Sequence, residues 1–161
     1  SGDKEKLEAQ ASRIYWSRLF GDPGFRRTPG EGERPNHFLD YGYAVLRGIV
    51  ARAICASGLH PTLGLHHHHR DNSFCLADDV MEPFRPLVDH AVCHLVREGM
   101  AKADLNRDTK SILLSPMMGR LVWEGNNLTL FDGLSMLTAS LGQRFAGEDV
   151  ELSLPAPLSF D

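Results

Sequence analysis

One segment, residues 37–57, constrains the fold of this chain more than any other. It follows Pro35 and Asn36, stops at Gly58, and is apolar or small at most positions of its central part, YGYAVLRGIVARAICAS. Proline favours the start of a helix and glycine its end, while small side chains let neighbouring helices approach closely. We therefore predict a long central helix that other elements largely bury.

The residues before this segment predict a helix followed by a loop. Asp3 is a suitable cap for a helix that runs to about residue 20, where Gly21 ends it. The apolar stripe expected to face the core of the protein consists of Leu7, Ala11, Ile14 and Leu19. Residues 21–35 are rich in glycine, proline and charge, which is typical of a surface loop.

Helical periodicity returns after residue 75 and predicts an all-α domain. Pro83 and Pro86 indicate either a kink there or a short turn over 78–82 before the main helix. Further helices are predicted at about 107–118 and 130–146, and the tail alternates like a short strand before a proline-rich coil. The predicted organisation is one helical domain over 1–161, with a first helix (1–20), a loop (21–35), a helical core (36–147) and a tail (148–161).

The cysteines and the hydropathy pattern predict a cytoplasmic protein with no membrane partner. Cys55, Cys75 and Cys93 are odd in number, lack CxxC spacing and lie in apolar stretches, so we expect small core residues in a reducing compartment. The first residues do not have the pattern of a secretion signal, and no apolar run approaches the roughly 20 residues of a membrane span.

Charge is distributed unevenly along the chain, whose formal net charge is -4. Residues 1–70 hold ten basic against seven acidic residues, and residues 71–161 hold seven against fourteen. Arginine outnumbers lysine thirteen to four, and its planar guanidinium suits phosphate recognition. A compositional bias of the genome would produce the same excess, so the charge pattern alone leaves nucleic-acid binding open.

Histidines and acids in the middle of the chain could bind a divalent cation. His66, His67, His68 and His69 form a run, and Asp79, Glu82 and Arg85 follow at intervals of three residues, which places them on one helix face. Oxygen ligands with one imidazole favour Mg²⁺ or Mn²⁺ over zinc. A solvated acidic turn at a helix start is the alternative that these residues leave open.

Two stretches carry a resemblance to a known family. NHFLDYGYAVLRGIVARAICASGLHPTLGLHHHH and, most specifically, LADDVMEPFRPLVD resemble the core of Cas1, the integrase of CRISPR adaptation, especially the versions that accompany Cas9. The upstream SGDKEKLEAQASRIYWSRLFGDPGFRR is similar to the start of the helical domain of Cas1 proteins. The resemblance therefore implies a Cas1 C-terminal helical bundle, without the N-terminal β domain of the family.

The resemblance also implies an activity and a set of site residues. The family's metal-binding glutamate, histidine and acid fall on Glu8, His67 and Glu82, with Asp79 as an accompanying acid and Arg85 at the basic position. The run of histidines leaves the position of the second ligand open by one residue in either direction. With Mg²⁺ or Mn²⁺, these residues would serve an endonuclease and integrase that inserts foreign DNA as new spacers, by attack of a 3′-hydroxyl on repeat phosphodiesters.

The partners implied by the resemblance are double-stranded DNA, Cas2 and, in the full-length protein, a second Cas1 subunit. We expect Arg85, Arg13 and Arg47 to contact DNA, although a solvated face would also explain the basic residues near Glu8. The tyrosines at 15, 41 and 43 are more typical of core residues with satisfied hydroxyls.

Two other functions remain open at the level of the sequence. One is a noncatalytic helical module that scaffolds DNA or binds proteins, with exposed acids and histidines. The other is a zinc hydrolase that uses several of the histidines, which the absence of an HExxH motif disfavours. The catalytic interpretation requires Glu8 to approach His67 and Glu82 in the folded chain.

Overall fold

The computed structural model describes residues 2–32, 34–66 and 70–157, and within the first helix it leaves out the side chains of residues 2–5 and Glu8. The elements are α1 (Gly2–Phe20), α2 (Asn36–Ala56), α3 (Cys75–Met81), the 3₁₀ turn η1 (Glu82–Phe84), α4 (Arg85–Arg97), α5 (Arg107–Met118), β1 (Arg120–Trp123), β2 (Asn126–Thr129) and α6 (Leu130–Phe145). The fold is predominantly helical, as predicted, and the predicted helix boundaries agree with it to within a few residues.

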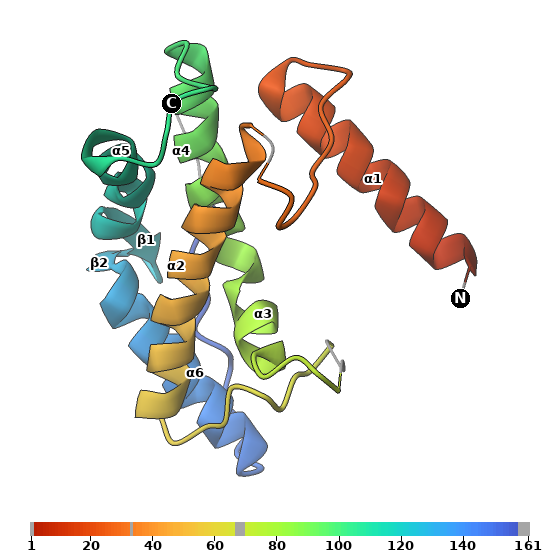
Figure 1. Cartoon of the computed structure of the whole chain (residues 1–161). Helices are drawn as coiled ribbons and strands as arrows, with labels where there is room; N and C mark the ends of the chain where they lie inside the picture. Colours follow the sequence, from red (N-terminus) through yellow and green to blue (C-terminus); the bar gives the residue numbers. More distant parts are fainter. Residues whose placement is uncertain (1, 33, 67–69, 158–161) are drawn as a thin grey trace.

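Helix α2 lies at the centre of the bundle and packs against α3, α4, α5 and α6 (Figure 1). Its fully buried side chains are Phe38, Leu39, Leu46, Val50 and Ile54. Each buried side chain of this size contributes about 1.5–3 kcal/mol relative to exposure. Gly42 lets α4 approach closely, because a Cβ at this position would lie 2.5 Å from Cγ1 of Val88. The predicted central helix is confirmed.

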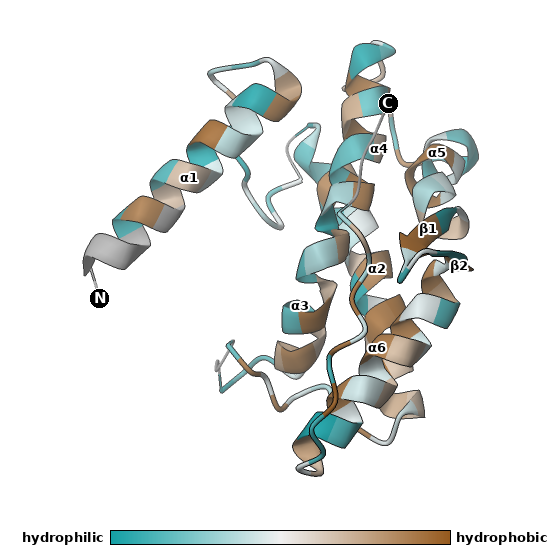
Figure 2. Cartoon of the chain, turned by 180° about the vertical axis from the view of Figure 1, so that it is seen from behind, coloured by the Kyte–Doolittle hydropathy of each residue, from teal (hydrophilic) through white to brown (hydrophobic). Residues whose placement is uncertain are grey.

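Helix α1 stands apart from the bundle and reaches it through its C-terminal half (Figures 1 and 2). Trp16 is buried there, with its ring 6.0 Å from that of Phe20 and 5.9 Å from that of Phe25. The predicted core-facing stripe is wrong at Leu7, Ala11 and Ile14, which are exposed, whereas Leu19 packs partly against the core. The prediction failed over most of the helix because α1 meets the core only at its end, through Trp16, Leu19 and Phe20. Helix α1 begins at Gly2, one residue before the predicted cap, whose side chain lies outside the described part of the structure.

The two prolines of the middle segment divide it into α3, η1 and α4. Pro83 lies in the first turn of η1 and Pro86 in the first turn of α4. Because the first N–H groups of a helix have no intrahelical acceptor, proline costs little there. The break predicted from these prolines is confirmed, and it starts a new helix turn at Glu82.

A two-stranded antiparallel hairpin, β1–β2, interrupts the predicted helical core. Its turn residues Glu124 and Gly125 have φ of 50° and 79°, as two-residue hairpin turns of type I′ require. Trp123 is completely buried, and a Cβ on Gly133 would lie 2.1 Å from its ring. No element was predicted between the helices expected at 107–118 and 130–146, so the hairpin was missed, while the predominantly helical class is confirmed.

The tail also differs from its prediction. Its described part, residues 148–157, forms no strand beyond an isolated bridge between Trp123 and Pro155. The alternation of apolar and polar residues in the tail does not come from a strand with its apolar side chains facing inward. The polar Ser153 is the buried residue, while Leu152 and Leu154 are exposed. The Ser153 Oγ accepts a hydrogen bond of 2.9 Å from the Trp123 indole. The tail thus covers the tryptophan of the hairpin.

Cysteine burial corrects one further prediction. Cys75 and Cys93 are buried, as expected, but Cys55 is exposed near the end of α2, where the helix leaves the core. Among the described residues, no helix combines the length and apolarity that crossing a membrane requires.

Candidate functional site

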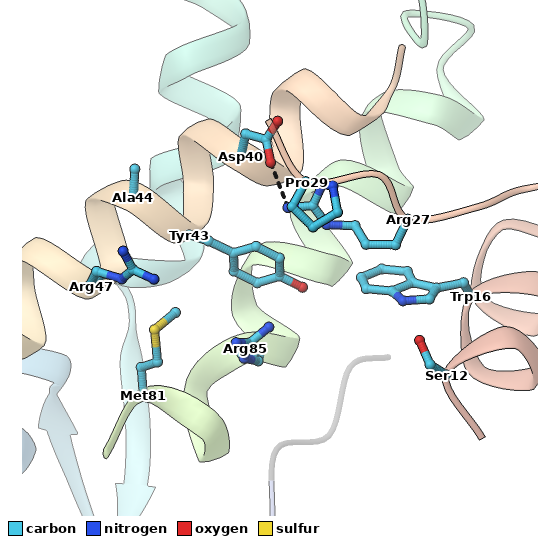
Figure 3. Close-up of a pocket in the computed structure, with 10 residues that line it drawn as sticks. All are labelled: Ser12, Trp16, Arg27, Pro29, Asp40, Tyr43, Ala44, Arg47, Met81 and Arg85. Atoms are coloured by element: carbon cyan, nitrogen blue, oxygen red, sulfur yellow. Dashed lines mark hydrogen bonds and ion pairs between the residues drawn. The ribbon is translucent and has the colours of Figure 1, made fainter. Parts of the chain in front are cut away.

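A cavity of about 470 Å³ lies where the C-terminal half of α1 meets the bundle (Figure 3). Its lining comes from α1, the following loop, α2, α3 and α4: Ser12, Trp16, Arg27, Pro29, Asp40, Tyr43, Ala44, Arg47, Met81 and Arg85. Segments far apart in the sequence therefore form one concave surface. Three of its lining residues are arginines and one is acidic, so the lining itself carries a net positive charge.

The three arginines differ in how firmly they are held. Arg27 is fixed, because its guanidinium donates to Asp40 Oδ1 at 2.6 Å and to Asn36 Oδ1 at 3.1 Å. The guanidinium of Arg47 lies 2.7 Å from Oδ1 of the buried Asp78, while its side chain stays 45% exposed. Arg47 and Arg85 thus keep part of their donor surface accessible beside a fixed Arg27.

Arg85 and Glu82 form an ion pair at the start of α4. The Arg85 Nε lies 2.9 Å from Glu82 Oε1, although the N–H does not point along a hydrogen-bond direction. Half of the Glu82 side chain is exposed. The Arg85 guanidinium also lies 4.9 Å from the ring centroid of Tyr43, which extends from α2 into the cavity (Figure 3). Of the two ion-pair partners that the spacing offered to Arg85, the structure pairs it with Glu82.

Asp79 anchors the turn that leads to the histidine run. Its Oδ2 accepts hydrogen bonds from the backbone N–H groups of Leu65, at 2.6 Å, and of His66, at 2.9 Å. The turn is thereby attached to α3, one helical turn before Glu82. This contact gives Asp79 a structural role, while its predicted role beside a metal stays a prediction.

A buried acid that the sequence analysis missed connects three helices. Asp89 of α4 is 3% exposed and accepts hydrogen bonds from the hydroxyls of Tyr15 in α1 and Tyr43 in α2. Burial raises the pKa of Asp89, and the two hydroxyls and Arg85 partly offset this rise. Burial and the neighbouring carboxylate likewise raise the pKa of both tyrosines. The expectation that these two tyrosine hydroxyls are satisfied is confirmed, but Tyr15 is not a core residue, because it is 43% exposed.

The predicted site residues are brought together only in part. Arg85 and Arg47 line the same cavity, and Glu82 directly precedes the helix that begins with Arg85. Arg13 does not join them, because it lines a separate hollow on α1 with Pro23. Arg26, part of the same basic cluster in sequence, donates to the carbonyls of its own loop.

Two predicted ligands cannot be placed. His67 and the side chain of Glu8 lie outside the described part of the structure, although position 8 itself lies in α1, one turn before Ser12. Among the side chains that are described, no group of three or more histidines, cysteines and acids is close enough to hold a metal ion. The predicted set of Glu8, His67, Glu82 and Asp79 therefore stays a prediction.

The chain resembles known proteins over most of its length. The family model for CRISPR associated protein Cas1 matches residues 5–125. The CRISPR-associated endonuclease Cas1 of Neisseria meningitidis serogroup C (strain 8013) is 37% identical over 140 residues, which cover 87% of this chain and 45% of the relative. A second relative, from Francisella tularensis subsp. novicida (strain U112), is 32% identical over 152 residues, covering 88% and 48%.

A solved structure shares the fold. A casposase bound to an integration product superposes with a TM-score of 0.69 at 23% identity, covering 86% of this chain and 45% of that one. The chain spans about half the length of the curated relatives it matches. The family model, the relatives and the helical fold agree, and the chain belongs to the Cas1 family of CRISPR-associated proteins.

Proposed function

We propose that this chain forms the helical catalytic part of a metal-dependent DNA endonuclease and integrase, which inserts foreign DNA fragments into a CRISPR array as new spacers. The observation that carries this proposal is the Glu82–Arg85 pair beside a basic cavity, in a chain of the Cas1 family. The relatives named above are called endonucleases, and the casposase is described with an integration product.

Arginine side chains supply the proposed phosphate contacts. Arg85 and Arg47 are partly exposed and line the same cavity, and a guanidinium can donate two parallel hydrogen bonds to a phosphate. Their acidic partners, Glu82 and Asp78, limit the net charge while DNA is absent. Arg13 lies outside this cavity, so we propose that it contacts DNA farther along α1.

The donor set fits a hard divalent cation. Glu82 offers a half-exposed carboxylate, whereas Oδ2 of Asp79 already accepts two backbone hydrogen bonds, which leaves Glu82 the better ligand of the two. Two carboxylates and one imidazole suit Mg²⁺ or Mn²⁺. We propose that Glu8, His67 and Glu82 hold the ion, with Asp79 keeping the histidine turn in place. Such an ion, when bound, lowers the charge of the attacked phosphate and favours ionisation of the attacking hydroxyl.

The proposed reaction exchanges one phosphodiester for another. The 3′-hydroxyl oxygen of the incoming fragment forms a bond to phosphorus as the bond to the repeat's own 3′-oxygen breaks. The attacking oxygen loses a proton and the leaving oxygen gains one, so the reaction needs no covalent bond to the protein. Arg85 would orient the attacked phosphate, and its pairing with Glu82 supports a position for that phosphate next to the proposed metal ligand.

The larger assembly belongs to the proposal as well. We propose double-stranded DNA, both protospacer and repeat, as the substrate, Cas2 as a partner, and a second Cas1 subunit in the full-length protein. A reaction on an intracellular array places this activity in the cytoplasm.

The test is strand transfer into a CRISPR-repeat duplex with Mn²⁺, with and without Cas2, comparing the wild type with Glu82→Ala and Glu98→Ala. Glu98 is an exposed glutamate at the other end of α4 and serves as the matched control. We expect the Glu82 variant to lose about 100-fold or more in rate, because a metal ligand contributes several kcal/mol to transition-state stabilisation. The Glu98 variant should retain the wild-type rate.

Two results would oppose the proposal. Equal rates in the Glu82→Ala variant and the wild type would exclude Glu82 as a ligand. DNA binding without Mn²⁺ binding or strand transfer in the wild type, even with Cas2, would favour the noncatalytic scaffolding module instead. Calorimetric titration of the wild type and the Glu82 variant with Mn²⁺ separates these results from a simple loss of folding.

A further inference from the structure

Asp89 occupies the point where three helices meet. Its carboxylate projects from α4, and its two oxygens accept from hydroxyls on two other helices, Oδ2 from Tyr15 of α1 and Oδ1 from Tyr43 of α2. A buried carboxylate that connects three elements is costly to retain unless the hydrogen bonds compensate for lost hydration. The proposed reaction assigns no chemical step to Asp89, so its burial between the three helices needs another explanation.

We propose that Asp89 is a positioning residue that holds α1, which carries Glu8, in register with η1 and α4, which carry Glu82 and Arg85. This inference rests on the proposed function, because it concerns the alignment of the two halves of that site. Asp89 itself touches neither DNA nor metal in this proposal.

The first step of the argument concerns the attachment of α1. Tyr15 donates to Asp89, and one turn later the Cys93 thiol of α4 donates to the carbonyl of Leu19 at 3.2 Å. Position 8 lies seven residues before Tyr15, which is roughly 10 Å along a helix axis. Because α1 is attached through its C-terminal half, a change in its tilt at Tyr15 displaces position 8 more than it displaces Tyr15 itself. The link at Tyr15 is therefore well placed to set the location of Glu8.

The second step concerns Arg85. The hydroxyl of Tyr43 is held by Asp89, and the Tyr43 ring lies 4.9 Å from the guanidinium of Arg85 and 5.6 Å from that of Arg27. A cation above an aromatic face is attracted to it. Arg85 in turn pairs with Glu82. The contacts thus run without a gap from the buried carboxylate through Tyr43 and Arg85 to the proposed metal ligand.

The third step concerns the need for a carboxylate. A carboxylate offers two oxygens that both accept, whereas asparagine has one acceptor oxygen and one donor nitrogen. Asp89→Asn therefore keeps the size of the side chain but weakens at least one of the two tyrosine links. Tyr15→Phe and Tyr43→Phe remove the links one at a time.

The experiment uses the whole chain and four variants: Asp89→Asn, Tyr15→Phe, Tyr43→Phe and, as a matched control, Tyr41→Phe. Tyr41 also lies on α2, but its ring contacts Lys110 instead. The first measurement is hydrogen–deuterium exchange of the α1 amides. We expect the exchange rate of the α1 amides to rise about tenfold in Asp89→Asn and Tyr15→Phe, because the stabilisation from a hydrogen bond to a charged group corresponds to a change of about that size. In Tyr43→Phe and Tyr41→Phe the exchange rate should stay unchanged.

The second measurement is the Mn²⁺ dependence of binding and of strand transfer. In Tyr15→Phe we expect the Mn²⁺ concentration at half-saturation to rise several-fold, with the rate restored at high Mn²⁺, because α1 is displaced but no ligand is lost. In Tyr43→Phe we expect the rate at saturating Mn²⁺ to fall instead, because Arg85 loses its support. If Asp89 had only a structural role, both tyrosine variants would lose stability, but one would not change Mn²⁺ affinity while the other changed the saturated rate.

Each failure has its own signature. Unchanged α1 exchange in Tyr15→Phe would overturn the positioning role, whatever happens at Glu82. Faster α1 exchange with unchanged Mn²⁺ affinity and rate, while Glu82→Ala stays inactive, would reduce Asp89 to a structural residue and overturn it as well. Failure of the proposed function is recognised separately, by full activity of the Glu82→Ala variant.

Discussion

The bundle around α2 and the outlying helix α1 are held in place by different forces. The bundle has a continuous core that includes Leu39, Leu46 and Trp123, all fully buried. Among its described side chains, helix α1 contributes one buried residue, Trp16, with Leu19 and Phe20 packed partly against the core, and it also attaches through polar links such as the one from Tyr15 to Asp89. The bundle can therefore be stable without α1, whereas the candidate site cannot be complete without it.

This difference separates stability from site geometry. Apolar burial is non-directional, so it determines whether the bundle folds but only loosely where α1 points. Hydrogen bonds depend on direction, and Asp89, the acceptor for Tyr15 of α1, also holds Tyr43, which lines the cavity together with Arg47 and Arg85. Substitutions in the core should thus reduce folding, and substitutions at the α1 contact should misalign the site.

The largest expected effect is that of Trp123→Ala. The indole is fully buried between Phe84 and Gly133 and donates to Ser153, so its removal leaves a large cavity. We expect the free energy of unfolding to fall by about 3–5 kcal/mol, measured by urea denaturation followed by circular dichroism.

Val122→Ala is the control for this substitution, because its half-exposed side chain belongs to the same strand. If Trp123→Ala lost no more stability than Val122→Ala, the hairpin would not belong to the core.

A smaller global effect is expected for Trp16→Ala. The ring packs on Phe20 and Phe25 at the point where α1 joins the hydrophobic core. We expect α1 to detach, with faster amide exchange in residues 6–20, while the free energy of unfolding of the bundle falls by about 1 kcal/mol or less. Loss of stability as large as that of Trp123→Ala would instead make α1 part of the same cooperative unit.

The helices were largely predictable because their signals are local. Pro35, Gly58 and Asn106 mark helix ends in the sequence, and Asn106 does cap α5, accepting from the N–H groups of Asp108 and Thr109. The hairpin was missed because its strands are only four residues long and its burial depends on Trp123 meeting the tail and α6. Long-range packing of this kind leaves a weak trace in periodicity.

The candidate site was predictable where its parts are close in sequence. The interval of three residues placed Glu82 and Arg85 on one helix face, and the structure pairs them. Asp89 was not identified, because its partners lie 74 and 46 residues away and nothing in PLVDHAV distinguishes it from a surface acid. The position of Arg13 outside the cavity likewise depends on the rotation of α1, which its misleading apolar stripe did not indicate.

Removal of the acid that holds the turn before the histidines should have a smaller effect on stability, and one confined to that turn. In Asp79→Ala, the N–H groups of Leu65 and His66 lose their shared acceptor, which we expect to cost about 1 kcal/mol. Amide exchange of residues 62–66 should rise while that of α2 stays unchanged. Asp149→Ala removes an exposed ion-paired acid and should alter neither. A general loss of protection would show that Asp79 supports the core rather than the turn.

The smallest expected effect is a dependence on pH of the polar link between α1 and the bundle. Burial, only partly offset by the tyrosine hydroxyls, Arg85 and Arg27, raises the pKa of Asp89 above its ordinary 3.8. A raised pKa means that the folded state binds the proton more tightly than the unfolded state, so the contribution of this proton to stability is complete below pH 3.8 and is lost as pH rises through the higher folded pKa.

Asp89→Asn lacks this titration, while Tyr15 and Tyr43 stay neutral because their pKa values are raised. The difference in the free energy of unfolding between the wild type and Asp89→Asn should therefore shrink as pH increases from 4 toward neutrality, in urea titrations at several pH values. A difference that instead grew with pH would mean that the hydroxyl hydrogen bonds outweigh desolvation, and the link would then be strongest when the carboxylate is charged.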